Sequence, residues 1–274
     1  MDRDYIINNL VAGVYTNKDK YMKRFTENWQ KHYTNVPLIF NVRDGKINEN
    51  MERLRIDFRE NHSDKRYWLF MDDDILFTRN DVIETALNYM IEKDIALMTT
   101  YQTTDKHLAN NFNPETLTFE HITWSAGYFM LVDSKKIGLL PFDMELPTDY
   151  GSLADIEYSM KVIVNNHLIG IAPTIILHED NGYSPKCKEP FKITKDNEKE
   201  INKSVKKFFK NLPKRLMYGS PNMEIVFLDS GEIDRNETIG HQYLKWKYPE
   251  IHNEVVARKN YNTLSTKGKF TNQL

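Results

Sequence analysis

Apolar positions along the chain form short continuous runs, separated by stretches in which they recur every three or four residues. The runs end at turn signals and predict buried strands, whereas the spaced stretches predict amphipathic helices. The expected strands are Leu10–Val14, Val36–Val42, Tyr67–Met71, Ile95–Met98, Ile122–Val132 (broken at Gly127), Ile169–Leu177 and Glu224–Leu228. The expected helices are Asp19–Tyr33, Asn48–Asn61, Asn80–Lys93, Asp155–Asn165 and Asp196–Leu212. This alternation predicts an α/β protein with a mostly parallel sheet and ligands at the carboxyl ends of its strands.

Length and cysteine content narrow the class of protein. The 274 residues allow one large domain or two small ones. The single cysteine, Cys187, excludes a disulfide scaffold and fits a reducing compartment. The polar start of the chain does not resemble a signal peptide, and the near-apolar stretch 168–177 is too short to span a membrane. We therefore expect a soluble, cytoplasmic protein.

Charge is unevenly distributed although the net charge is only −2. Residues 1–185 carry 19 basic and 28 acidic side chains, whereas residues 186–215 carry 11 basic and 4 acidic ones. The expected helix 196–212 places its lysines on one face, among them Lys203 and Lys207. Such a face suits an anionic acceptor, for example nucleic acid, a phosphate-bearing glycan or a membrane surface, and a merely solvated surface accounts for it equally well.

Three consecutive carboxylates follow the apolar run Tyr67–Met71. Asp72, Asp73 and Asp74 repel one another unless a cation neutralises them, and a hard divalent ion such as Mn²⁺ or Mg²⁺ prefers oxygen ligands. Asp72 and Asp74 are two positions apart, so in an extended strand end both face the same ligand. The alternative is a solvated acidic loop before the next helix.

Two further sites carry candidate chemistry. His178 directly follows the apolar run 169–177, and imidazole can complete a carboxylate metal site, although a lone histidine here is more often a surface residue. Asp155 and Glu157 lie at a helix start, where they act either as helix caps or as a general base facing a cleft.

Several segments, taken in their order along the chain, resemble the nucleotide-sugar glycosyltransferases of GT-A fold. The similarity is to the large inverting family that includes the cellulose, chitin and hyaluronan synthases and many bacterial and phage enzymes. It covers about residues 10–184. The segments that carry it are VYTNKDKYMKRFTENW, VPLIFNVRDG, ENMERLRIDF, YWLFMDDD, WSAGYFMLVDSKKIGLLPFDMEL, LADIEYSMKV and IAPTIILHEDNGYS.

The resemblance implies a Rossmann-like mixed sheet and a role for each matched position. It implies a catalytic domain over residues 1–185 and an extension over 186–274 that packs on it. The implied donor contacts are Thr16, Asn17, Asp44, Arg53 or Arg55, Asp72 and Asp73. The implied metal ligands are Asp74, His178 and Asp72; the acceptor contacts are Trp124, Gly127 and Tyr128; the base is Asp155, with Glu157 as substitute. Trp124 and Tyr128 are equally suited to the core.

The implied reaction transfers a sugar from a nucleotide sugar, with a UDP-sugar favoured, to an acceptor hydroxyl with inversion. The chain has Ala154 where the family has the first acid of an E-D pair, and it lacks the Q-x-x-R-W segment of processive polymer synthases. A retaining enzyme remains an alternative because it shares the D-x-D segment. A HAD-type phosphatase, which would need Thr or Val where this chain has Leu76, is less favoured, as are a sugar nucleotidyltransferase without its Gly-rich loop and an inert nucleotide-binding domain. A phage origin would place the enzyme in the host cytoplasm.

Overall fold

The computed structural model describes most of the first two thirds of the chain and selected parts of the rest. The described residues are 2–16, 19–42, 46–146, 153–179, 235–252, 255, 263–264 and 270–271. Several expectations lie outside them, namely Asn17, Asp44, the helix 196–212 with Lys203 and Lys207, and the strand 224–228.

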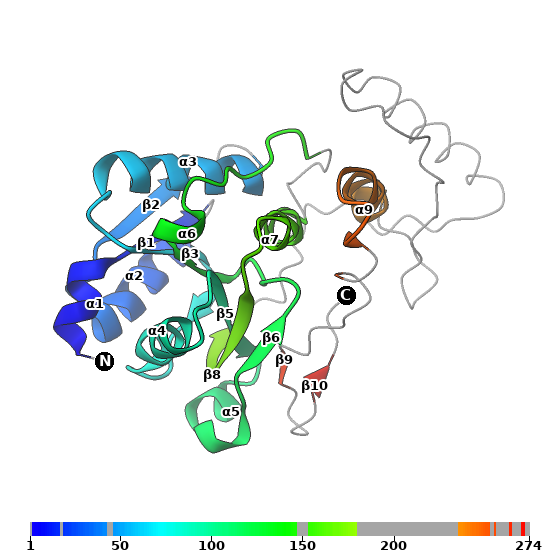
Figure 1. Ribbon diagram of the computed structural model, residues 1–274. Helices are drawn as coiled ribbons and strands as arrows, with labels where there is room; N and C mark the ends of the chain where they lie inside the picture. Colours follow the sequence, from blue (N-terminus) through cyan, green and yellow to red (C-terminus); the bar gives the residue numbers. More distant parts are fainter. Residues whose placement is uncertain are drawn as a thin grey trace.

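Helices and strands alternate along the described chain (Figure 1). The helices are α1 (Arg3–Asn9), α2 (Asp19–Tyr33), α3 (Ile47–Asn61), α4 (Val82–Glu92), α5 (Lys106–Asn110), α6 (Ser134–Ile137), α7 (Ala154–Val164) and α9 (Arg235–Lys247), with a 3-10 turn at Pro114–Thr116. The strands are β1 (Leu10–Thr16), β2 (Leu38–Val42), β3 (Tyr67–Asp72), β4 (Ile75–Leu76), β5 (Leu97–Thr103), β6 (Glu120–Ile122), β7 (Phe129–Asp133), β8 (Ile169–His178), β9 (Thr263–Leu264) and β10 (Phe270–Thr271).

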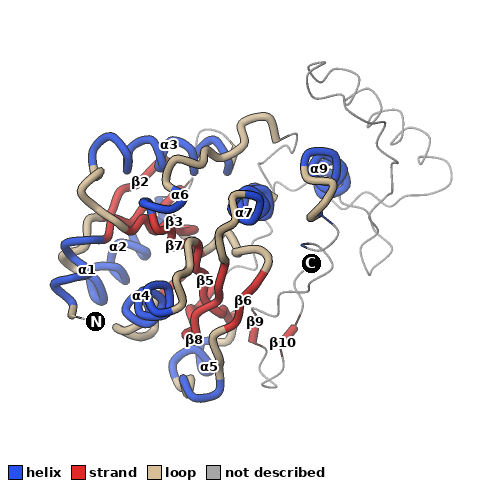
Figure 2. Tube along the Cα trace, in the orientation of Figure 1, coloured by secondary structure: helices blue, strands red, loops and turns tan. Residues whose placement is uncertain are grey.

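The strands form one mixed sheet. β1 pairs in parallel with β2 and β3, and β5 pairs in parallel with β8. β7 runs antiparallel between β3 and β5, while the short β4 and β6 run antiparallel to β8. A mixed sheet flanked by helices confirms the predicted α/β class (Figure 2).

Helices cover both faces of the sheet, as the alternating directions of the buried side chains of β1 require. Leu10, Ala12 and Val14 of this strand point into the cluster that also holds Phe25 and Trp29 of α2 and residues of α1 and α4. The intervening Val11 and Tyr15 point into a second cluster formed with α3, α6, α7 and α9. Because successive side chains of a strand face opposite sides, a run buried at every position needs a layer on each side, and the structure supplies both.

The predicted strand 122–132 is divided. Its first part forms β6 and its last part forms β7, and the segment from Thr123 to Tyr128 is a loop between them. Gly127 lies in this loop, where its backbone N–H is used by a side chain of α7 rather than by the sheet. The loop therefore starts beside Ile169, where β8 begins, and rejoins the sheet at Phe129, beside Met71 near the end of β3.

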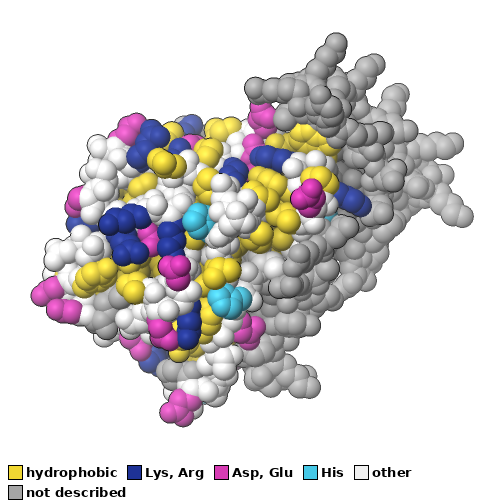
Figure 3. Space-filling view, viewed as in Figure 1, with side chains coloured by type: hydrophobic (Ala, Val, Ile, Leu, Met, Phe, Trp, Pro, Cys, Tyr) yellow, Lys and Arg dark blue, Asp and Glu magenta, His cyan; other side chains and the backbone are white. Residues whose placement is uncertain are grey.

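Contacts cross the predicted domain boundary at residue 185. Tyr243 and Leu244 of α9 are buried against the α7 side of the sheet, and Thr263 of β9 pairs with Gln102 of β5. The division into residues 1–185 and 186–274 stays a prediction. Among the helices that the structure describes, none has the length and apolar character needed to cross a membrane. On the face shown in Figure 3, basic and acidic side chains are interspersed with apolar ones over the described surface.

Candidate active site

Three predicted metal ligands meet at the carboxyl edge of the sheet. Asp72 is the last residue of β3, and His178 is the last residue of β8. Asp74 lies in the turn after β3, and the pairing of Ile75 with His178 draws that turn against the end of β8. One ligand atom of each side chain lies within 4.8 Å of the other two. Two carboxylates and an imidazole thus converge from separate parts of the chain.

The converging atoms are those that a cation would use. Asp74 Oδ1 and His178 Nε2 are 3.1 Å apart. These two atoms and Asp72 Oδ1 are buried, and none of them makes a hydrogen bond to any described residue. Buried polar atoms normally have a partner, so three that face one point indicate a missing one. Oxygen and imidazole ligands together suit ions such as Mn²⁺, so the residues fit a divalent metal.

The electrostatics of Asp72 lead to the same inference. Burial raises the pKa of the Asp72 carboxyl well above its ordinary value of 3.8, and the neighbouring Asp74, Asp73 and Asp155 raise it further. A bound cation would reverse this effect because it favours the ionised form. Without a cation, the neutral form of Asp72 is therefore favoured more than in an ordinary aspartate.

Gln102 orients His178 and was not predicted from the sequence. Its Oε1 accepts a hydrogen bond from His178 Nδ1, which leaves the Nε2 lone pair facing Asp74. Gln102 lies on β5, where it is almost fully buried, and β5 runs beside β8. Metal-binding histidines commonly have such a partner on the other ring nitrogen. The predicted strand 95–98 ended before Gln102, so no local pattern marked this residue.

Asp155 lies at the start of α7, close enough to affect Asp72 of the metal group, the name we give to Asp72, Asp74 and His178. Its Oδ2 accepts a hydrogen bond from the Gly127 N–H at 3.0 Å, and its Oδ1 accepts one from the Ile156 N–H at 2.9 Å. Burial raises the pKa of Asp155 above its ordinary value of 3.8, and these backbone hydrogen bonds offset part of that rise. Asp155 in turn raises the pKa of Asp72, so the two carboxylates lie within electrostatic reach of each other.

The loop 123–128 joins these two parts of the site. Gly127 donates to Asp155, and the Tyr128 carbonyl accepts from the Asp72 N–H at 3.3 Å. The Tyr128 side chain is buried, donates to the Thr100 carbonyl at 2.6 Å and contacts the His178 ring. Of the two roles open to Tyr128, the structure therefore places it in the core. Trp124 is partly buried against the core clusters on both sides of the sheet.

Glu157 does not share the site of Asp155. It is fully buried, and its carboxylate contacts Lys247 at 2.7 Å and the Tyr248 hydroxyl at 2.6 Å. The two acids are two residues apart on a helix, so they point about 200° apart around its axis. The expected substitute for the base is thus an ion-pair residue between α7 and α9.

The remaining donor candidates occupy different environments. Thr16 ends β1, and its hydroxyl donates to Asp73 Oδ2. Both residues therefore lie at the carboxyl edge of the sheet that carries Asp72, Asp74 and His178, which we call the metal edge. Arg53 is exposed on α3. Arg55 is buried and binds Glu52 and the Gly138 carbonyl, which is a structural use of that guanidinium. A donor contact at Arg53 or Arg55 stays a prediction.

One cation near the metal group was missed from the sequence. Arg24 of α2 pairs through Nη1 with Glu179, the residue directly after His178. Its Nε and Nη2 are buried and have no hydrogen-bond partner among the described residues. A guanidinium in this state is suited to a planar or tetrahedral oxyanion.

Comparisons with known proteins gave structural likeness only. No family model and no curated protein matches the chain. A mannosyltransferase from Pyrobaculum calidifontis, solved with GDP-Man and Mn²⁺, gives a TM-score of 0.45 at 12% identity over 91% of this chain and 73% of that one. GalNAc-T7, solved with UDP, GalNAc and Mn²⁺, gives 0.46 at 12% identity over 94% of this chain and 53% of that one. A mutant β1,4-galactosyltransferase 7 from Drosophila, solved with manganese, UDP-Gal and xylobiose, gives 0.41 at 11% identity over 82% and 91%.

Proposed function

We propose that the chain is a metal-dependent glycosyltransferase that moves a sugar from a nucleotide sugar to an acceptor hydroxyl. The observation that carries the proposal is the convergence of Asp72, Asp74 and His178 beside a separate carboxylate, Asp155. A phosphatase would need a nucleophilic aspartate, whereas here the first and third aspartates face a common point with an imidazole. The arrangement supplies a cation site and a base, which are the two groups that a single displacement at a sugar needs.

The metal site serves the leaving group. Asp72, Asp74 and His178 would hold Mn²⁺ or Mg²⁺, which would offset the charge of the departing diphosphate. Arg24 supplies a further cation at this edge; its Nε and Nη2 have no hydrogen-bond partner among the described residues and would donate to phosphate oxygens. Thr16, Asp73 and Arg53 are the donor contacts that we carry forward from the sequence, together with Asn17 and Asp44. A UDP-sugar is the favoured donor.

Asp155 serves the acceptor. It takes the proton of the acceptor hydroxyl while the acceptor oxygen bonds to the anomeric carbon. The bond from that carbon to the phosphate oxygen breaks, and its electron pair leaves with the nucleoside diphosphate. This is one displacement and therefore inverts the anomeric configuration. The Gly127 N–H holds Asp155 from the side of loop 123–128, which we call the acceptor loop. Trp124 and Gly127 are the acceptor contacts that we propose, with Lys203 and Lys207 for an anionic acceptor.

The test is release of nucleoside diphosphate from a panel of UDP- and GDP-sugars by the full chain. We expect hydrolysis of at least one donor with Mn²⁺ and its loss in excess EDTA. Asp74→Ala should abolish the reaction and keep the fold, whereas Asp64→Ala, a change at an exposed acid, should leave it unaltered. Full activity in EDTA would refute the metal site. Release of inorganic phosphate from simple phosphate esters would favour the phosphatase alternative, and the product's anomeric configuration separates inverting from retaining transfer.

A further inference from the structure

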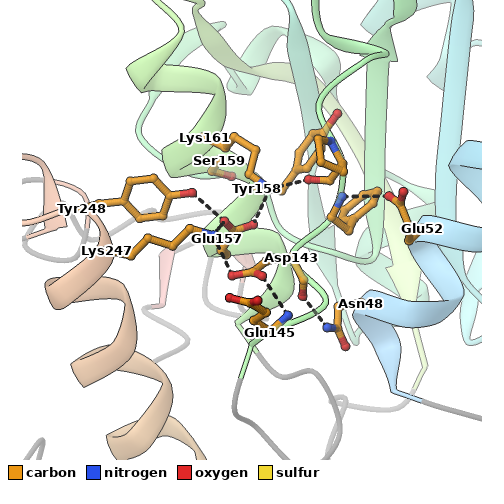
Figure 4. A network of polar contacts seen from close by, with 12 residues as sticks. Asn48, Glu52, Asp143, Glu145, Glu157, Tyr158, Ser159, Lys161, Lys247 and Tyr248 are labelled. Atoms are coloured by element: carbon orange, nitrogen blue, oxygen red, sulfur yellow. Dashed lines mark hydrogen bonds and ion pairs between the residues drawn. The ribbon is translucent and has the colours of Figure 1, made fainter. Parts of the chain in front are cut away.

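A buried group of charged and tyrosine side chains joins α9 to the start of α7 (Figure 4). We call it the α7–α9 clamp. Its members are Asp143, Glu157, Lys161, Tyr243, Lys247 and Tyr248. They come from the segment before α7, from α7 itself, and from α9 with the residue that follows it. No member belongs to the metal group or to the proposed donor contacts.

Lys247 is the centre of the clamp. Its Nζ lies 2.7 Å from Glu157 Oε1 and 2.7 Å from Asp143 Oδ2. The Tyr248 hydroxyl donates to the same oxygen of Glu157, and the Tyr243 hydroxyl donates to the same oxygen of Asp143, both at 2.6 Å. One ammonium group therefore holds together two carboxylates from separate segments, and each of the two hydroxyls donates to one of these carboxylates.

The charges within the clamp balance. Asp143 and Glu157 face Lys247 and Lys161, whose Nζ lies 3.2 Å from Glu157 Oε2. Burial alone would raise the pKa of Asp143, but hydrogen bonds from Lys247 and Tyr243 outweigh it and lower that pKa. Removing Lys247 would leave two buried carboxylates with one cation. Because an uncompensated buried charge is costly, the charged groups would shift or water would enter.

The clamp and the proposed base share one helical turn. Asp155 and Glu157 both lie in the first turn of α7. On the Asp155 side, the Gly127 N–H binds its carboxylate, and the Ser159 hydroxyl binds its carbonyl while accepting from the Ser125 N–H. On the opposite side, Glu157 is bound by α9. The start of α7 is thus held between the acceptor loop and α9.

We propose that Lys247 is a positioning residue for Asp155: by binding Glu157 and Asp143, it fixes the first turn of α7 against the acceptor loop. The inference rests on the proposed function, because it concerns the base of that reaction. It adds a residue outside the metal group that governs transfer to the acceptor and leaves donor binding unchanged. A displacement of about 1 Å in a reacting group can lower a rate by about a hundredfold.

The experiment compares Lys247→Met with Lys247→Arg, and with Lys135→Met as the matched control at an exposed lysine of α6. We expect Lys247→Met to lower the kcat of transfer by about ten- to a hundredfold. Mn²⁺ affinity and nucleotide affinity, measured by titration calorimetry, should stay within about twofold of the starting protein. Lys247→Arg should recover much of the rate, and Lys135→Met should match the unmodified chain.

A double variant separates positioning from stability. Lys247→Met with Glu157→Gln removes a cation and an anion together, so it should be more stable than Lys247→Met while its kcat stays low. Wild-type kcat in that double variant, or an equal loss of Mn²⁺ and nucleotide affinity, would overturn the proposal.

Hydrogen exchange of the α7 amides distinguishes failure of the positioning proposal from failure of the proposed function. Lys247→Met should speed exchange in the first turns of α7, whether or not sugar is transferred. If the unmodified chain transfers no sugar, the proposed function falls, and this readout still tests the clamp. Unchanged exchange in α7 would refute the clamp itself.

Discussion

The amide oxygen of Gln102 accepts the Nδ1 proton of His178, so a residue on β5 sets the orientation of a ligand on β8. The tautomer follows from this contact, because a carbonyl oxygen can only accept. His178 therefore directs Nε2 toward Asp74.

We predict that Gln102→Leu lowers the affinity for Mn²⁺ by about ten- to a hundredfold, the usual effect of removing such a partner. The reason is that the His178 ring loses both its preferred tautomer and its fixed rotation. Titration of Mn²⁺ into the protein without nucleotide measures the effect. Gln30→Leu, at an exposed glutamine of α2, is the control. Equal affinity in both variants would mean that the ring is oriented by packing on Tyr128 alone.

Asp155→Asn is expected to lower transfer by about a hundred- to ten thousandfold while donor binding is retained. The amide keeps a hydrogen bond to Gly127 but cannot accept the acceptor's proton. In the unmodified chain, burial raises the pKa of Asp155, and the base works only when ionised. Transfer should therefore decline as the pH falls through this raised pKa, at a higher pH than for an ordinary aspartate. Normal transfer by the variant would place the base elsewhere.

The stability of the α9 region should depend on pH through His241. Burial, and then the neighbouring His252, lower the pKa of His241 from 6.5 to about 4. Between these values the unfolded chain binds a proton that the folded chain does not, so the free energy of unfolding falls as the pH is lowered from about 6.5 to about 4. The full loss is about 3 kcal/mol.

Urea unfolding at pH 7 and at pH 4.5 measures this loss. His241→Gln should reduce the difference between the two pH values, because glutamine does not titrate. His107→Gln, at an exposed histidine of α5, should keep the full difference. The prediction fails if both variants lose the same stability as the unmodified chain.

Gly13→Ala should destabilise the fold by about 1–3 kcal/mol, the range for overpacking a core. A Cβ on Gly13 of β1 would lie 2.6 Å from Phe58 Cζ and 2.8 Å from Leu54 Cδ2. Both side chains are buried, so neither can move away without disturbing α3. Thermal unfolding measures the change, and Mn²⁺ affinity at low temperature should be retained because the site is at the end of the strand. A variant as stable as the parent would show that α3 shifts freely.

The metal edge could be predicted because each apolar run of the sequence ends abruptly in polar residues. β3 ends in the aspartates and β8 ends in His178, and in a sheet of this kind the ends of these strands meet at one edge. Gln102 was not predicted, since its importance depends on the register between β5 and β8. That register is a long-range property that local patterns do not contain.

For two other residues, helical geometry could have predicted the difference between the expected and the observed position of the side chain. Arg55 lies on the same face of α3 as Met51 and Phe58, one turn from each, so it points into the core rather than toward a nucleotide. Asp155 and Glu157 cannot both face one cleft from positions two apart on a helix. The partners of Glu157, however, come from α9, and nothing in the local sequence of α7 identifies them.

The attachment of α7 to α9 also sets an order of events during synthesis. α7 leaves the ribosome well before α9, and at roughly 5–20 residues per second the interval is on the order of ten seconds. Throughout this time Glu157 lacks Lys247 and Tyr248, so the first turn of α7 cannot settle with its carboxylate buried. If the proposed function holds, a nascent chain would carry its metal ligands before it has a fixed base, and translation of α9 would be the step at which the new protein gains the ability to activate an acceptor.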